Sequence, residues 1–318
     1  MKERRPFRAI LLLTAFMTGL SLFLAGLNIS ANERNLEQKR LGVSLADLFG
    51  DIRYALGFIG DIRGYYGLED GLVEKDAALD EVTGLYVLDQ DGLILSSSVG
   101  DGLPESVLSL ENGSSLIING KFYACYSISG TELMIAREDA GRMIVSITTK
   151  SLRFSAFAGI GFLLVLLIFL VLTYATKKSH MGSPMLVLLA WMIFFTGVVC
   201  YRSADGYLKS LDALEPEIEA LFAEDLARLE DTGITEDMIT DIDGYLARYA
   251  EQVPEVDSVS FRDGRLFFVR DQETIRKYLL DYVIQTVLSL AFAIMILFEF
   301  RISYKQMRGG KEAGNGEG

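Results

Sequence analysis

Few residues of this 318-residue chain have the types and spacing that catalysis requires. The only histidine, His180, lies in a short polar stretch, so a histidine-based nucleophile and base pair has little support. The sequence contains no zinc-ligand spacing, no glycine-rich phosphate loop and no G-x-S-x-G turn. Asp89 and Asp91 are close together, but a predicted hairpin turn accounts for both. We therefore predict a protein that is not an enzyme and holds no metal or cofactor.

Four apolar stretches dominate the sequence and predict a multi-span membrane protein. Each has about 17 to 22 residues, the length a helix needs to cross a hydrocarbon layer of roughly 30 Å. The first follows a basic N-terminus and could be a cleaved signal peptide, but its length favours an uncleaved anchor. The third could instead be a buried helix of a soluble domain. The predicted transmembrane helices comprise residues 9–29, 153–175, 185–201 and 279–300.

The distribution of charge predicts the orientation of these helices. Lysine and arginine near membrane spans are retained on the cytoplasmic side, which places residues 1–8, 176–184 and 301–318 inside. Residues 31–153 hold 19 acidic against 11 basic residues, and residues 202–278 hold 19 against 9. We expect these acidic segments to be solvated, extracytoplasmic parts of a protein of the prokaryotic cytoplasmic (inner) membrane. Their acidity argues against nucleic acid as a partner.

The first extracytoplasmic segment, residues 30–152, has the pattern of an α+β domain. Apolar residues spaced by 3 and 4 predict a long helix over 33–63 that continues out of the first span, and a Gly-Tyr-Tyr-Gly break follows at 64–67. Shorter helical pieces are predicted at 76–81 and 104–110. Turn signals at Asp89-Gln90-Asp91-Gly92, Asn119-Gly120 and Ser129-Gly130 separate apolar runs. The pattern predicts a five-stranded antiparallel sheet, with strands at 83–88, 93–98, 115–118, 121–128 and 131–137.

The second extracytoplasmic segment, residues 202–278, is predicted to be a shortened repeat of the first. Two helices, 205–229 and 235–252, precede EVDSVSFRDGRLFFV at 255–269, which echoes EVTGLYVLDQDGLIL at 81–95. An isolated two-stranded hairpin is marginally stable in water. We expect this hairpin to pack on its own helices, on the first domain or on a second protomer.

The order of elements in residues 31–152, together with GLYVLDQDGLILSSS at 84–98, resembles the extracytoplasmic PAS-like sensor domains of the Cache group. The resemblance implies a ligand pocket between the sheet and the helices. Aromatic and cationic side chains near such a pocket would suit a small carboxylate, another small anion or an amino acid. The predicted ligand-binding residues are Arg63, Tyr65, Tyr66, Tyr86, Lys121, Tyr126 and Arg137.

The sequence therefore predicts a sensor or regulator that signals through its membrane helices. Only residues 301–318, predicted to be a disordered tail, follow the last span, so we expect a separate membrane or cytoplasmic protein to receive the signal. The alternative is a structural or accessory membrane subunit that uses its external domains as an interaction surface. The apolar face of 33–63 is explained equally by homodimer formation and by packing on its own sheet. Cys125 and Cys200 are expected to be unpaired.

Overall fold

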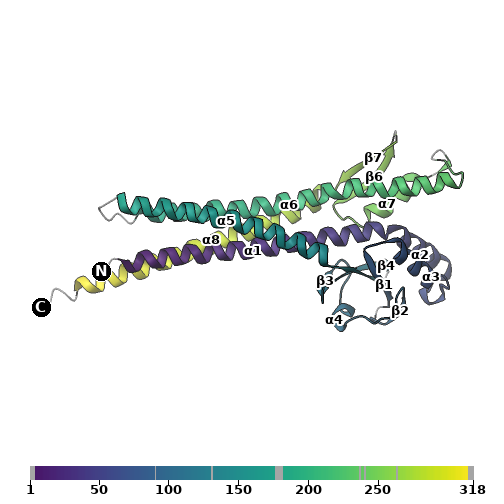
Figure 1. Cartoon of the computed structure of the whole chain (residues 1–318), viewed down its shortest axis with the longest axis horizontal. Coiled ribbons are helices and arrows are strands. Elements are labelled where there is room, and N and C mark those ends of the chain that lie inside the picture. The colour runs from purple at the N-terminus through teal and green to yellow at the C-terminus, as the bar shows by residue number, and fades with distance from the viewer. Residues whose placement is uncertain are drawn as a thin grey trace. The chain divides into compact units, whose positions relative to one another are not determined.

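The computed structural model describes residues 4–89, 91–129, 132–175, 182–235, 238–239, 241–262 and 264–313 (Figure 1). His180 and the predicted Ser129-Gly130 turn lie wholly or partly outside these residues. The chain divides into two compact units. We call residues 1–30, 148–207 and 276–318 the helical unit, and residues 31–147 and 208–275 the sheet unit.

Among the residues that the structure describes, three helices are long and apolar enough to cross a membrane, and part of each belongs to the helical unit. They lie within α1 (Arg4–Ser44), α5 (Gly141–Ala175) and α6 (Gly182–Asp231), and they include most of the first three predicted spans. The fourth predicted span lies within α8 (Gln272–Ala313), which is not among the three. All three helices exceed the roughly 20 residues that a bilayer requires, so each has a part that extends beyond its apolar core. Leucines 163, 164 and 167 of α5 are more than half exposed, as lipid-facing side chains are.

Trp191 is the centre of packing in the helical unit. Its indole ring stacks on Phe195 at 5.3 Å between centroids, and its Nε1 donates a hydrogen bond to Thr18 Oγ1 at 3.3 Å. The ring also lies against Gly161 of α5, where an added Cβ would come within 2.5 Å of it. A glycine at this position therefore allows α5 and α6 to approach closely, as small residues do in membrane helix packing.

The sheet unit contains the predicted five-stranded antiparallel sheet, in the order β2-β1-β5-β4-β3. Leu85 of β1 pairs with Ala136 of β5, and Ala124 of β4 pairs with the same alanine, so the last strand lies in the middle. Asn119 and Gly120 both have positive φ, 51° and 74°, as a tight Asn-Gly hairpin turn requires. The strands are β1 (Val82–Leu88), β2 (Ile94–Ser97), β3 (Ser115–Ile118), β4 (Lys121–Ser129) and β5 (Glu132–Asp139).

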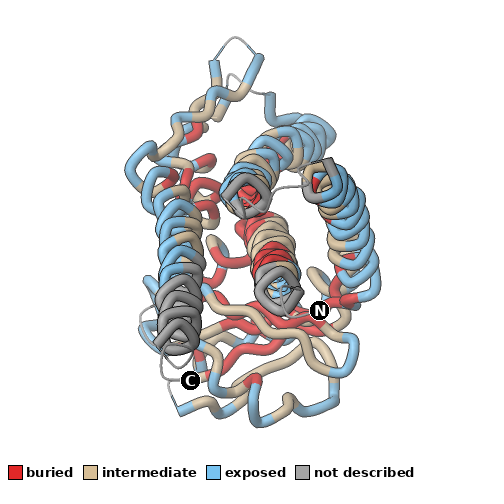
Figure 2. The backbone as a smooth tube through the Cα atoms, turned by 90° about the vertical axis from the view of Figure 1, so that its left-hand side faces the viewer, coloured by how far each residue is buried: buried red, intermediate tan, exposed pale blue. Residues whose placement is uncertain are grey.

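The two faces of this sheet are covered by different segments. The end of α1, with α2 (Ala46–Ile59) and α3 (Leu68–Ala78), packs its leucines on one face in a cluster with Phe122 and Met134. The other face, which includes Tyr86 and Ile135, is covered by α4 (Glu105–Leu108) and its flanking loops. Figure 2 shows the buried residues gathered on these strands. Helical segments therefore lie on both faces of the sheet.

Several helix boundaries differ from the prediction, each for a local reason. The helix predicted over 33–63 is divided at Leu45 into α1 and α2. Helix α2 ends at Ile59 and is followed by Gly60, which has the left-handed conformation (φ 77°) common after helices. The helix predicted at 76–81 lies at 68–78 instead, because Glu69 and Asp70 favour a helix N-terminus there. A short 3₁₀ helix, Ile62–Gly64, lies between them.

Most of residues 202–278, the second predicted extracytoplasmic segment, belongs to the same compact unit as most of the first. Its first helix is the end of α6, and its second is α7 (Ile242–Ala250), which begins later than predicted because Asp241 caps it by accepting a hydrogen bond from Gly244 N. Strands β6 (Val256–Arg262) and β7 (Arg265–Arg270) form the predicted hairpin. Within the unit this hairpin packs on its own helices, with the rings of Phe222 and Phe261 5.2 Å apart.

Ion pairs connect the two segments of the sheet unit. Lys39 of α1 contacts Glu255, and both side chains are more than nine-tenths buried. Arg40 Nε lies 2.9 Å from Glu217 Oε2 of α6. Buried charges are stable only when they are paired with good geometry. These contacts hold residues more than 170 positions apart in one folded body.

Candidate functional site

Tyr86 and Arg137 are the two predicted ligand-binding residues that the structure brings together. The Arg137 guanidinium lies 5.6 Å from the centre of the Tyr86 ring. Both bind Asp101: the Tyr86 hydroxyl donates to Oδ1 at 3.0 Å, and Arg137 Nη1 donates to Oδ2 at 2.6 Å. The hydrogen bond from Arg137 lowers the pKa of Asp101, and burial raises the pKa of Tyr86. Tyr86, Arg137 and Asp101 therefore bind one another, and they attach the loop after β2, which contains Asp101, to the sheet.

Lys121 and Tyr126 lie on β4, away from that group. Tyr126 is on the opposite face of the sheet from Tyr86, and its hydroxyl donates to the backbone oxygen of Gln38 at 2.5 Å. It therefore attaches α1 to the sheet. Lys121 pairs with Asp139 at 3.2 Å on the surface.

The remaining three predicted residues follow α2. Arg63 pairs with Asp89 at 3.2 Å, Tyr65 packs against the core, and Tyr66 is 99% exposed. The seven residues thus occupy both faces of the sheet and a surface loop. Tyr86 and Cys125 both pair with Ile135, so they share a face of the sheet. Because side chains alternate along a strand, Tyr126 lies on the opposite face and cannot share a pocket with Tyr86.

A different part of the sheet unit contains a pocket of about 240 Å³, which we call the acidic pocket. Helices α2 and α3 form one wall, and α6 and α7 form the other. Its lining includes five carboxylates and two cationic side chains, as well as Tyr249 and several apolar residues. The charged residues are Asp47, Asp51, Glu74, Glu224, Asp225, Lys75 and Arg228.

Internal contacts satisfy part of this charge and leave an excess of carboxylates. Arg228 Nη2 lies 2.7 Å from Glu224 Oε1. Asp225 Oδ2 accepts hydrogen bonds from the hydroxyls of Tyr245 and Tyr249 at 2.5 and 2.7 Å and lies 3.2 Å from Arg248. Lys75 Nζ donates to Asp47 at 2.8 Å.

Asp51 lies one helical turn after Asp47 on α2, and burial, followed by the charge of Asp47, raises its pKa. A cation in the pocket would relieve this repulsion.

Sequence reasoning missed the acidic pocket because residues from two distant segments form it. One local signal was present: Asp47 and Asp51 are spaced i, i+4 on a helix, where two like charges destabilise it. Such a spacing indicates that a cation lies close to the two carboxylates. The opposite wall, with Glu224 and Asp225, comes from α6, which is far from α2 in the sequence but lines the same pocket.

No protein-family model matches this chain, and no curated protein or solved structure shows significant similarity to it.

Proposed function

We propose that this chain is a non-enzymatic, multi-pass membrane sensor or regulator whose sheet unit binds a small cationic solute outside the cytoplasm. The observation that supports it best is the acidic pocket, which both extracytoplasmic segments form together. Five carboxylates outnumber the three cationic groups beside them, namely Lys75, Arg228 and the Arg248 that pairs with Asp225, and this excess favours a positively charged ligand. An amine, or an amino acid with a cationic side chain, suits this charge better than the small carboxylate that the sequence suggested.

The size of the pocket also restricts the ligand class. Its volume of about 240 Å³ lies below the roughly 300–1,000 Å³ typical of pockets for drug-sized molecules. A diamine or a basic amino acid is of suitable size. The aliphatic part of such a ligand would lie against Val43, Leu48 and Leu221, which are among the lining residues.

The walls of the pocket provide a route for a signal. Ser44, the last residue of α1, and Leu221 of α6 both line it, and each of these helices includes a segment able to span a membrane. A ligand that favours one of two arrangements of these helices would change the relative populations of the two arrangements in the membrane. A separate membrane or cytoplasmic protein would receive the change.

The proposed setting is the prokaryotic cytoplasmic membrane, with four spans and both termini inside. The basic flanks of the spans support this orientation. The long helix α1, the five-stranded antiparallel sheet and the path from β5 into α5 are the elements that a Cache-type domain would have, and they support that assignment as part of the proposal.

Isothermal titration of the full chain in lipid nanodiscs tests the ligand class. Putrescine, agmatine, lysine and arginine are compared with succinate. We expect saturable binding of at least one cation and none of succinate. Asp51→Asn should weaken that binding by about tenfold, a loss of roughly 1.4 kcal/mol. Asp257→Asn, at an exposed position on β6, should leave binding unchanged. Failure of every cation to bind would refute the proposal.

A structural or accessory subunit is the second candidate, and exposed aromatic residues favour it. Tyr54 and Phe58 of α2 are 72% and 76% exposed, with their rings 5.0 Å apart, and Tyr66 lies beyond the same helix. Aromatic side chains are enriched at protein interfaces. Affinity purification from native membranes distinguishes the two functions: a stoichiometric partner that is retained without ligand and lost in Phe58→Ser would favour the subunit.

A further inference from the structure

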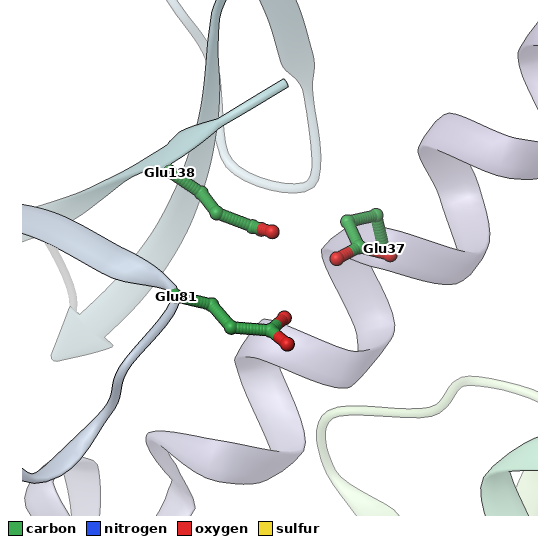
Figure 3. Close-up of side chains that lie close together, drawn as sticks. All are labelled: Glu37, Glu81 and Glu138. Carbon is green, nitrogen blue, oxygen red and sulfur yellow. The ribbon is translucent and has the colours of Figure 1, made fainter. Parts of the chain in front are cut away.

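Three glutamates from separate parts of the sheet unit meet beside the sheet (Figure 3). Glu37 lies on α1, Glu81 immediately precedes β1, and Glu138 lies near the end of β5. The pairing of Val82 with Glu138 in the sheet brings the last two together. One carboxylate oxygen from each residue lies within 4.8 Å of the others.

Glu138 is the member of this group that most requires a positive partner. It is 4% exposed, on the same buried face of β5 as Met134 and Ala136. Its Oε2 is buried and has no hydrogen-bond partner among the residues that the structure describes. Figure 3 shows the side chain directed toward Glu37. A buried carboxylate oxygen without a partner loses its hydration with no compensation.

The electrostatic environment of Glu138 agrees with this geometry. Two arginines lie nearby, but each has another role. Arg40 is 3.5 Å from Glu37 and binds Glu217 more closely, and Arg142 pairs with Glu81. Three carboxylates therefore face two guanidinium groups that are partly engaged elsewhere.

We propose that Glu37, Glu81 and Glu138 bind a divalent metal cation, with Ca²⁺ the best match. Calcium is held by oxygen ligands at about 2.3–2.6 Å, so two ligands on opposite sides of the ion lie about 4.6–5.2 Å apart. The separation of up to 4.8 Å between the glutamate oxygens fits this geometry. Magnesium requires a near-ideal octahedron at about 2.0–2.1 Å and dehydrates reluctantly. The buried oxygen of Glu138 therefore favours calcium.

This site is separate from the acidic pocket, because none of the three glutamates is among the pocket's lining residues. A bound cation would join α1 to both β1 and β5. It would thus fix the helix that leaves the first predicted span against the sheet. Calcium binding then stabilises the sheet unit whether or not the acidic pocket takes an organic ligand.

Thermal unfolding of the full chain in detergent, after removal of metals with a chelator, tests the site. CaCl₂ is the only ligand added. We expect a saturable rise in the midpoint for the natural chain, and a smaller rise with MgCl₂. Glu138→Gln keeps the shape of the side chain and removes the buried charge, so this variant should fold. Its apparent affinity for Ca²⁺ should fall at least about tenfold, since even indirect ligand supports contribute 10- to 100-fold.

Glu111→Gln is the matched control, because Glu111 is exposed and distant in sequence from the three glutamates. It should respond to Ca²⁺ like the natural chain. An equal response of all three proteins would place calcium elsewhere on the acidic surface and overturn the proposal. A natural chain whose unfolding midpoint does not respond to Ca²⁺ would also overturn the proposal. If the Glu138→Gln variant were then more stable than the natural chain, the glutamates would share only a proton.

Discussion

Replacement of Lys39 by methionine should destabilise the sheet unit more than any surface change. Lys39 and Glu255 form an ion pair in which the side chains are 8% and 1% exposed. Removal of one partner of a buried pair costs about 3 to 5 kcal/mol, because a buried charge loses its counter-charge. For a unit of this size, that corresponds to a decrease of roughly 10 °C in the unfolding midpoint.

The assay is thermal unfolding of the full chain in detergent, followed by near-ultraviolet circular dichroism. The double variant Lys39→Met/Glu255→Met should recover most of the loss, because two apolar side chains can replace a buried pair at little cost. Lys121→Met, in an exposed pair with Asp139, should leave the midpoint nearly unchanged. If Lys39→Met were as stable as the natural chain, the buried pair would not hold the two segments together, and the account of one sheet unit would be wrong.

Three further predictions concern packing, charge and a thiol. Gly161→Ala places a methyl group within 2.5 Å of the single tryptophan, Trp191, and should shift its fluorescence, whereas Gly159→Ala, with open space around it, should not. Asp51→Asn should slightly raise the midpoint of thermal unfolding at pH 7. Because the pKa of Asp51 is raised in the folded state, its ionised form destabilises the fold, and stability declines as pH rises through that pKa. Near pH 3 the carboxyl group is protonated, so the small gain from Asp51→Asn should vanish there. Burial raises the pKa of Cys125 to about 11, so iodoacetamide at pH 8 should modify it only after unfolding; rapid modification of the folded chain would contradict its burial.

The elements that local chemistry determines could be predicted from the sequence. The Asn119-Gly120 turn fixed the register of β3 and β4 because few other residues adopt positive φ. The apolar spacing over 33–63 predicted one apolar face. Leu41, Leu48 and Ile52 of that face pack on the sheet, whereas Ile59 is 45% exposed. The division at Leu45 was not predictable from spacing, since the same periodicity continues through it.

The sites depend on contacts between distant segments, which spacing does not reveal. Glu138 did offer a signal: alternation along β5 places it on the face of Met134 and Ala136, where an acidic residue is unusual. Its partner Glu37 is about 100 residues away on α1. The acidic pocket similarly combines residues of α2 and α6, and spacing along the chain does not relate those two helices.

The accessibility of introduced cysteines on intact cells tests the central claim most directly, namely that both acidic segments lie outside the cytoplasm. Ser106→Cys and Ser258→Cys are exposed positions, one in each segment, and are introduced singly after replacement of Cys125 and Cys200 by serine. A membrane-impermeant maleimide should label both on intact cells. Ser179→Cys, in the predicted cytoplasmic loop, should be labelled only after permeabilisation. If Ser106→Cys or Ser258→Cys required permeabilisation, that segment would lie inside and the proposed sensor could not bind an external solute.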